Sequence, residues 1–247
     1  IEMTRRMSHI IAHRGPDDHG LFFDDQCVFA HRRLSIIDLT TSGRQPFPSD
    51  DHRYHIVFNG EIYNYIELRE ELEQNGWYFR TRTDTEVLLK SYLTFGANCL
   101  AKLNGMFAFA VYDSSENQIF IARDRMGIKP LYYALIKNRL YFASEIKALI
   151  ALSDIKTTIC YQSIYDYLVF NRTDVHSETF FDEIKRIPKG HYASYGQGVL
   201  RIVQWWNPLN YLTSDCEEDT GKVQQVIGEL LSSAVRLRMR SDVTVGS

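Results

Sequence analysis

One apolar run constrains the fold of this chain most strongly: Met106-Phe107-Ala108-Phe109-Ala110-Val111-Tyr112. Its seven residues are far fewer than the roughly 20 that a membrane-spanning helix needs, so we exclude a transmembrane segment. Side chains of a strand point alternately to opposite faces, so a strand without polar positions must be covered on both faces. The run therefore predicts a central strand in a sheet that has one layer packed above it and another below it.

Shorter apolar segments predict the remaining strands and helices. Segments of β-branched or aromatic residues between turn residues indicate strands at 28–30, 34–37, 55–58, 119–122, 131–136, 140–143, 191–195 and 200–205. Apolar residues spaced three and four apart indicate helices at 1–12, 64–76, 84–95, 145–152, 161–170 and 223–235. We expect Asn64 to cap its helix together with Glu67.

Composition narrows the classes of partner. Apolar residues make up 45% of the 247 residues and charged residues 24%, which is typical of an ordinary globular chain. A net charge of −3 gives no global attraction to nucleic acid or to a membrane surface, so we expect neither as a partner. The four cysteines lie far apart, without a CxxC pair, which favours a reducing, cytoplasmic compartment. His9 and His13 lack a third ligand, so we expect no metal site.

A polar stretch between residues 207 and 220 is the best candidate for a linker. The helix predicted after it carries an apolar stripe, and no strand long enough to cover this stripe follows. We therefore predict one domain over residues 1–206 and the beginning of a second over 207–247. The chain starts at Ile1 and stops in a strand-like run just as Gly246, the glycine typical of a phosphate loop, appears, so we expect it to be trimmed at both ends.

The segment Asn59-Gly60-Glu61-Ile62-Tyr63-Asn64 is the strongest chemical signal. We interpret it as a glycine turn between a buried strand and a helix, where a bare backbone N–H faces a ligand. The Asn59 amide and the Gly60 N–H would then be two neutral donors converging on one oxygen, as a tetrahedral acyl-transfer intermediate requires. An Asn-Gly hairpin turn without chemistry explains the same residues about equally well.

Two charged residues have a functional and a plain interpretation. Arg33, at the start of an expected strand, has a forked guanidinium that suits a carboxylate, although most lone arginines are solvated surface charges. Asp84, in Thr83-Asp84-Thr85-Glu86, is either an ammonium ligand or an anion in the first turn of a helix. The residues alone leave both alternatives open.

A string of ordered motifs resembles the glutaminase domain of glutamine-dependent asparagine synthetases over residues 9 to 195. The motifs are His13–Asp17, Arg33–Asp38, Gln45-Pro46, Asn59–Asn64, Thr83–Glu86, Gly105–Ala110, Ala122–Tyr133 and Phe142–Glu145. The wider class II amidotransferases share the first and middle motifs. The Arg33–Asp38 string and Ser241-Asp242-Val243 are more similar to the asparagine synthetase branch.

The resemblance implies an α+β fold, the four-layer αββα sandwich of the N-terminal-nucleophile hydrolases. The helix near the C-terminus would then be the first of an α/β domain similar to the ATP pyrophosphatases. In that family an N-terminal cysteine attacks the glutamine side chain, and the released ammonia crosses to the second domain. That domain uses ATP and Mg²⁺ to activate aspartate. The resemblance also leaves a homodimer open.

Site residues follow from the resemblance position by position. Arg33 would hold the α-carboxylate of glutamine, and Glu61 and Asp84 would hold its α-ammonium group. Asn59 and the Gly60 N–H would form the oxyanion hole. The backbone of four consecutive residues would line the pocket: Leu34, Ser35, Ile36 and Ile37.

The nucleophilic cysteine of the family is not among the residues of this chain, so we expect the chain alone to be inactive. Two alternatives to an asparagine synthetase remain. One is a sister amidotransferase that amidates a sugar or a secondary metabolite. The other is a glutamine-binding module without catalysis.

Overall fold

The computed structural model describes residues 1–173, 176–212 and 219–244. Its helices are α1 (Glu2–Ile10), α2 (Tyr65–Gln74), α3 (Asp84–Phe95), α4 (Cys99–Lys102), α5 (Ile146–Ile150), α6 (Tyr161–Phe170) and α7 (Thr220–Arg238). Its strands are β1 (Asp18–Phe23), β2 (Val28–Arg33), β3 (Phe47–Pro48), β4 (Tyr54–Ile62), β5 (Gly105–Asp113), β6 (Gln118–Arg123), β7 (Tyr132–Ile136), β8 (Arg139–Ala143), β9 (Lys185–Arg186), β10 (His191–Gly196) and β11 (Val199–Gln204).

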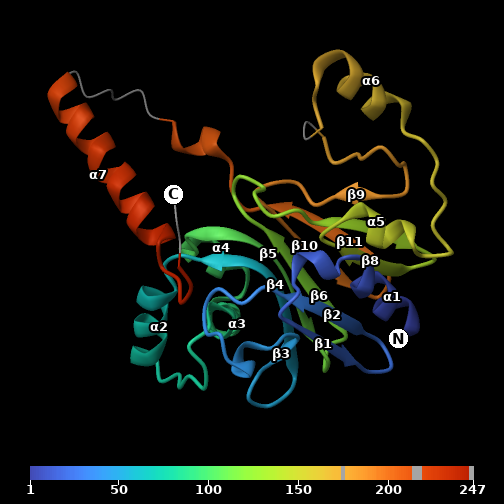
Figure 1. The fold of residues 1–247 in the computed structure, drawn as a ribbon, viewed down its shortest axis with the longest axis horizontal. Coiled ribbons are helices and arrows are strands. Elements are labelled where there is room, and N and C mark those ends of the chain that lie inside the picture. The colour runs from blue at the N-terminus through green and yellow to red at the C-terminus, as the bar shows by residue number, and fades with distance from the viewer. Residues whose placement is uncertain (174–175, 213–218, 245–247) are drawn as a thin grey trace.

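The described strands pair antiparallel in three groups. Six of them form one sheet in the order β11-β10-β6-β5-β4-β3. The long apolar run lies in β5, in the interior of this sheet. The second layer consists of the hairpin β1-β2 and the three-stranded group β8-β7-β9. Figure 1 shows these strands in the middle of the molecule, with α2 and α3 on one side and α1 and α5 on the other.

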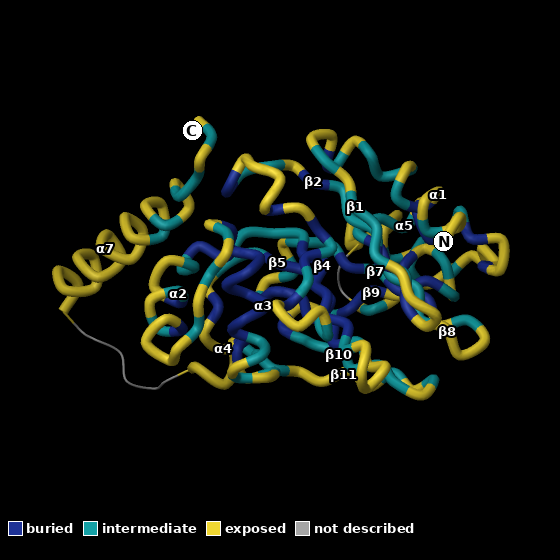
Figure 2. Tube along the Cα trace, turned by 90° about the horizontal axis from the view of Figure 1, so that it is seen from below, coloured by how far each residue is buried: buried dark blue, intermediate teal, exposed yellow. Residues whose placement is uncertain are grey.

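The alternation of side chains along β5 explains why its sequence is apolar at every position. Phe107 and Phe109 point into a core covered by α2, α3 and α4. Ala108 and Tyr112 point the other way, into a core shared with Phe29 of β2. Both faces are therefore removed from water, as the run predicts, and Figure 2 shows β4, β5 and α3 in the buried centre.

A third core completes the layers. Met7 of α1 and Leu149 of α5 pack against Ala134 of β7 and Ala143 of β8. The order of layers is thus helices, sheet, sheet, helices, and the predicted α+β sandwich is confirmed.

The predicted strand at residues 34–37 is wrong. β2 ends at Arg33, and the chain then turns, with Asp38 at a positive φ of 55°. The carbonyl oxygens of this loop accept hydrogen bonds from the Arg33 guanidinium instead of a neighbouring strand. The Arg33 side chain, and not a neighbouring strand, is therefore the hydrogen-bond partner of the backbone in this loop.

The predicted turn at Asn59-Gly60 is also wrong, and so is the hairpin alternative. β4 runs through both residues to Ile62 and stays in register with β5, Gly60 opposite Phe107 and Ile62 opposite Gly105. Pairing over nine residues outweighs the local turn preference of the Asn-Gly dipeptide.

The capping prediction at Asn64 fails in its detail. Asn64 precedes α2 as expected, but its side chain makes no hydrogen bond within the helix. Its amide donates to the Lys102 carbonyl at 3.0 Å, and its Oδ1 accepts the Asn104 N–H at 2.8 Å. Asn64 therefore ties α2 to the chain before β5.

The remaining predicted strands and helices agree with the structure to within a few residues. The six-residue strand β1 and the shorter elements β3, β9 and α4 were not predicted. Residues 213–218 of the predicted linker and 245–247 of the terminal run lie outside the described residues. No helix in the described part of the chain is long and apolar enough to cross a membrane.

Candidate active site

A cavity of about 220 Å³ opens where the loop after β2, the end of β4 and the start of α3 meet. Eight of the nine predicted site residues line it: Arg33, Leu34, Ile36, Ile37, Asn59, Gly60, Glu61 and Asp84. Residues up to 51 positions apart in sequence, from Arg33 to Asp84, therefore meet in one place.

Ser35 is the exception. Its backbone N–H donates to Asp17 Oδ2 at 2.8 Å, and it does not line the cavity. The prediction that Ser35 lines the pocket is wrong, because the loop turns this residue toward Asp17.

The open edge of β4 supplies one wall of the cavity. The Phe58 N–H donates to Gln45 Oε1 at 2.6 Å and the Ile62 N–H to Asp84 Oδ2 at 3.0 Å, both on the side away from β5. Alternate residues of an antiparallel strand direct their N–H groups to the same side. The N–H of Gly60, which lies between these two residues, therefore also points to the open edge and into the cavity.

Glycine is required at position 60 by close packing. A Cβ atom there would lie 2.1 Å from the Met106 carbonyl oxygen and 2.8 Å from the Phe107 Cα atom. Both are backbone atoms of β5, which cannot move aside without breaking the sheet. Any larger residue would shift the edge that presents this N–H.

The side chains of Asn59 and Glu61, two residues apart, point to the same face of β4. Asn59 Nδ2 is buried without a hydrogen-bond partner among the described residues, and so is Glu61 Oε1. An unpaired buried donor or acceptor costs about 1–3 kcal/mol, so folded proteins seldom keep two side by side. Their presence in one cavity marks positions where a ligand would supply an acceptor and a donor.

Asp84 is the most perturbed acid of the site. The residue is only 6% exposed, and its carboxylate accepts the Ile62 N–H. Burial, together with the neighbouring Glu61 charge, raises the pKa of Asp84 to about 7. Burial also raises the pKa of Glu61. Two acids that resist ionisation favour a cation placed between them.

Arg33 holds the loop after β2 and still has N–H groups left for a ligand. Its guanidinium donates to the carbonyl oxygens of Thr40 at 2.6 Å, Ile37 at 3.3 Å and Asp38. A guanidinium has five N–H groups, so these three bonds leave capacity for a carboxylate. A Cβ atom on Gly43 would lie 2.1 Å from Arg33 Nη2, so this glycine makes room for the guanidinium.

Further residues of the cavity were not predicted as site residues, among them Arg14, Gln45 and Lys129. Each lies inside one of the ordered sequence motifs, and this position was the signal that could have identified it as a cavity residue. Burial lowers the pKa of Lys129, and the nearby Arg14 charge lowers it further. The lining of the cavity contains more basic residues than acidic ones: Arg14, Arg32, Arg33 and Lys129 against Glu61 and Asp84.

Comparison with known proteins places this chain in a family. The family profile described as a glutamine amidotransferase domain matches residues 2–206. The chain belongs to the glutamine amidotransferase family. Among curated relatives, the glutamine-hydrolysing asparagine synthetase 1 of Bacillus subtilis is 41% identical over all of this chain. The amidase chry2 of Gibberella zeae is 34% identical over 99% of it.

The amidotransferase chain is shorter than these relatives. It spans 38% of the length of the Bacillus subtilis protein and 36% of the Gibberella zeae protein. Among solved structures, glutamine phosphoribosylpyrophosphate amidotransferase from Bacillus subtilis superimposes with a TM-score of 0.60 at 19% identity, covering 83% of this chain and 46% of that one. This likeness concerns the fold, and it confirms the predicted N-terminal-nucleophile hydrolase sandwich.

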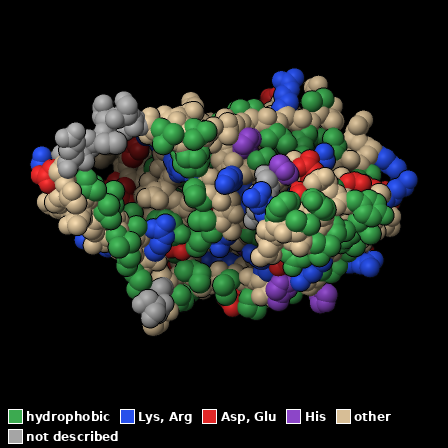
Figure 3. All heavy atoms as spheres, turned by 90° about the horizontal axis from the view of Figure 1, so that it is seen from above, with side chains coloured by type: hydrophobic (Ala, Val, Ile, Leu, Met, Phe, Trp, Pro, Cys, Tyr) green, Lys and Arg blue, Asp and Glu red, His purple; other side chains and the backbone are tan. Residues whose placement is uncertain are grey.

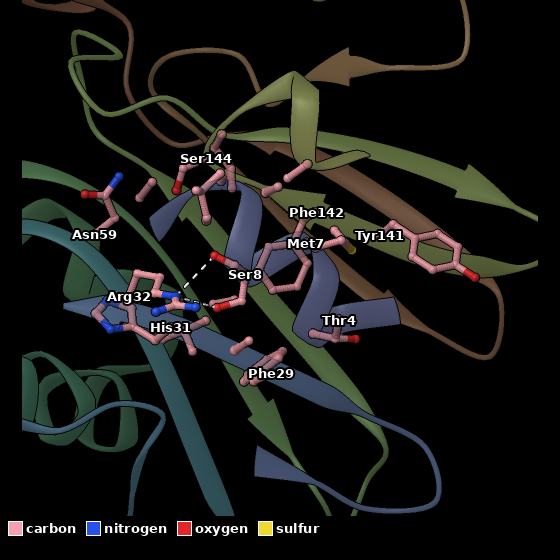
Figure 4. Close-up of a pocket in the computed structure, with 18 of the residues that line it drawn as sticks. Thr4, Met7, Ser8, Phe29, His31, Arg32, Asn59, Tyr141, Phe142 and Ser144 are labelled. Atoms are coloured by element: carbon pink, nitrogen blue, oxygen red, sulfur yellow. Dashed lines mark hydrogen bonds between the residues drawn. The ribbon is translucent and has the colours of Figure 1, made fainter. Parts of the chain in front are cut away.

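A second cavity of about 160 Å³ lies between the two layers of strands and shares Arg14, His31, Arg32, Phe58 and Asn59 with the first. Figure 4 shows Asn59, His31 and Arg32 at one end of it and Tyr141 at the other.

His31 lies where the two cavities meet. Its Nε2 bonds the Phe58 carbonyl at 3.0 Å, so this nitrogen carries the proton, and burial lowers the pKa of His31 to about 4. The imidazole is therefore neutral, with a bare, buried Nδ1.

None of the described cysteines belongs to the site. Cys27, Cys99 and Cys160 line neither of the two cavities. Burial raises the pKa of the Cys99 thiol to about 12, and it also raises the pKa of Cys27. Thiols with raised pKa values are poor nucleophiles, so these two residues are structural. Within residues 1–173, 176–212 and 219–244, no group of three His, Cys, Asp or Glu could hold a metal ion.

Proposed function

We propose that this chain is the glutaminase part of a glutamine-hydrolysing asparagine synthetase, which binds glutamine in the cavity beside β4 and releases ammonia from its side chain. One observation carries the proposal. Asn59 Nδ2 and Glu61 Oε1, a donor and an acceptor on one face of β4, are both buried and unpaired in the same cavity. A free amino acid with a carboxamide at one end and an ammonium group at the other satisfies both.

The charged end of glutamine fits the charged groups. Its α-carboxylate would bind the remaining N–H groups of Arg33, and its α-ammonium group would bind Asp84 and Glu61. The two acids have raised pKa values because they are buried close together, so a bound ammonium group returns them to the ionised state. Binding energy at this end holds the carboxamide in place.

The neutral end of the site suits the reaction. The Gly60 N–H and the Asn59 amide would donate to the carboxamide oxygen, which becomes charged only when the amide is attacked. Donors that strengthen as charge develops stabilise the transition state more than the substrate. Attack also needs a thiol, which Cys27, Cys99 and Cys160 do not supply. The resemblance supplies it as an N-terminal cysteine, which would have to lie beside Asn59.

The synthetase half is proposed from the relatives. ATP with Mg²⁺ and aspartate would act in a second domain, of which residues 207–247 form the beginning. The domain division, a homodimer and a cytoplasmic location stay predictions from the sequence. No described residue of the cavity beside β4 is proposed to bind ATP.

Titration calorimetry with the purified chain tests glutamine binding without requiring turnover. We expect heat of binding with L-glutamine and none with D-glutamine, whose ammonium and carboxylate groups are exchanged in space. Absence of binding by L-glutamine, or equal binding of both enantiomers, would contradict the proposal.

The acceptor of the ammonia needs a separate experiment. The full-length protein is incubated with glutamine, ATP and either aspartate or candidate sugars. Formation of asparagine supports the proposal, and an amidated sugar supports the sister amidotransferase. Glutamine binding without ammonia release in the full-length protein would indicate a binding module.

A further inference from the structure

The chain beyond α7 returns to the wall of the proposed glutamine cavity. Arg240, Ser241 and Asp242 follow α7, about 200 residues after the loop that they contact. Figure 1 shows the lower end of α7 and the chain after it next to α2, on the side of the molecule where β4 ends. This segment, residues 240–242, is called the return segment below.

The return segment is joined to the cavity loop by two hydrogen bonds, one between backbone groups and one from a backbone N–H to the Asp242 carboxylate. The Asp242 N–H donates to the Ile36 carbonyl at 3.0 Å. The Asp38 N–H donates to Asp242 Oδ2 at 2.7 Å. Asp242 is thus hydrogen-bonded to both Ile36 and Asp38, and the residue between these two, Ile37, lines the cavity.

Asp38 connects this contact to the rest of the site. Its Oδ2 accepts the Arg82 N–H at 3.1 Å, two residues before Asp84. Its Oδ1 accepts the Thr40 N–H at 3.1 Å. Its carbonyl oxygen accepts a hydrogen bond from the Arg33 guanidinium. Asp38 therefore links the return segment to Arg33 and to the backbone just before Asp84.

The return segment is itself fixed in place. Arg240 Nη1 donates to Glu67 Oε2 of α2 and to the Tyr63 carbonyl, each at 2.6 Å. Tyr63 follows directly after β4, close to Glu61. The segment therefore rests on the same strand end that forms the cavity, so its position is set relative to the site.

The backbone of the loop is restrained by side chains and not by pairing with a neighbouring strand. Residues 34–38 belong to no strand, and Arg33, whose orientation they set, is the proposed carboxylate anchor. Loss of the carboxylate at position 242 would leave the Asp38 N–H without its partner and free the loop to shift. The guanidinium would move with the carbonyl oxygens that hold it.

We propose that Asp242 is a positioning residue of the glutamine cavity: it fixes the loop at Ile36–Asp38 and, through it, the orientation of Arg33. This inference rests on the proposed function of the cavity. Since the return segment follows α7, glutamine affinity depends on where that segment lies. By reciprocity, bound glutamine resists displacement of the segment.

The test compares three variants of the chain by glutamine calorimetry. Asp242→Ala removes the carboxylate that accepts the Asp38 N–H. We expect the Kd for glutamine to rise about tenfold, which corresponds to the loss of one charge-assisted hydrogen bond. Asp242→Asn keeps a side-chain oxygen for the Asp38 N–H, so its Kd should stay within about threefold of the parent chain. Ser241→Ala is the matched control, because the hydroxyl of Ser241 is 3.5 Å from the Ile36 carbonyl oxygen, and the hydrogen bond that it accepts from the Val243 N–H at 3.1 Å does not involve the cavity loop.

A second readout separates positioning from general destabilisation. Hydrogen exchange measured by NMR should show the Asp38 amide exchanging faster in Asp242→Ala, while amides in β5 keep their protection. Unchanged glutamine affinity in Asp242→Ala, an equal loss in Asp242→Asn, or a uniform rise in exchange across β5 would each overturn the inference. A parent chain that binds no glutamine would overturn the proposed function, and this inference with it.

Discussion

Asn59 and Asp84 line the same cavity but would meet opposite ends of glutamine. Replacing Asn59 by Ala removes a neutral donor to an oxygen that is charged only in the transition state. We expect a rise of roughly 2.7 to 4 kcal/mol in the barrier of the full-length enzyme with little change in glutamine affinity. Asp84→Ala should instead weaken binding about tenfold or more. Calorimetry and ammonia release measured in parallel distinguish the two roles. Equal losses of glutamine affinity in the two variants would contradict the assignment.

The raised pKa of Asp84 predicts a pH dependence of glutamine binding. Below its pKa of about 7 the carboxyl group is protonated and cannot pair with an ammonium group. Each pH unit below the pKa should therefore lower affinity about tenfold, which gives about 30-fold weaker binding at pH 5.5 than at pH 8. The Asp84→Asn chain, which cannot ionise at this position, should bind weakly with a flatter profile. An affinity of the parent chain that is constant over this range would contradict the role of Asp84.

At the scale of elements, the motif order selected residues that line one cavity but did not predict the secondary structure that carries them. Asn59 and Gly60 were expected in a turn and lie in β4. Gly60 pairs with Phe107 of β5, which is 47 residues away in sequence, and no local pattern reveals this partner. The segment 34–37 has strand-like side chains but serves as a loop around Arg33. In both cases a long-range partner decides the structure.

The segment before α3 depends on a buried ion pair. Lys90 Nζ lies 2.9 Å from Glu86 Oε1 with both side chains nearly inaccessible, and Glu86 also accepts the Arg80 and Thr81 N–H groups. Lys90→Met leaves a buried charge without its partner, so we expect a loss of about 3 kcal/mol in the free energy of unfolding.

Lys102→Met is the matched control for that prediction. Lys102 pairs with Glu71 at 2.7 Å, but both side chains are 40% exposed, so the loss should stay below about 1 kcal/mol. Urea unfolding of the two variants measures the difference. Similar, small losses in both would show that the Glu86–Lys90 pair does not stabilise this segment.

For the whole molecule, the sequence predicted the layers well because they follow from one doubly apolar strand and from regular helix patterns. The predicted apolar stripe of α7 is indeed exposed: Ile227, Leu230 and Leu231 are each more than half accessible. Figure 3 shows hydrophobic side chains along the end of the molecule that carries this helix. The sequence could not reveal the return segment, because its contacts with Asp38 join residues about 200 positions apart.

The predicted division between the domains can be tested by truncation. A chain ending at Asn207 lacks the exposed stripe of α7 and keeps the three cores, so we expect it to stay folded and monodisperse. Size-exclusion chromatography with light scattering measures this. If the shorter chain aggregates while the full chain stays monodisperse, the domain boundary lies elsewhere.

A crystal structure of the chain soaked with L-glutamine tests the central claim most directly. The account predicts the α-carboxylate on Arg33, the α-ammonium group between Glu61 and Asp84, and the carboxamide oxygen within hydrogen-bond distance of Asn59 Nδ2 and the Gly60 N–H. Glutamine bound in another place, or bound here with its carboxamide turned away from β4, would contradict it.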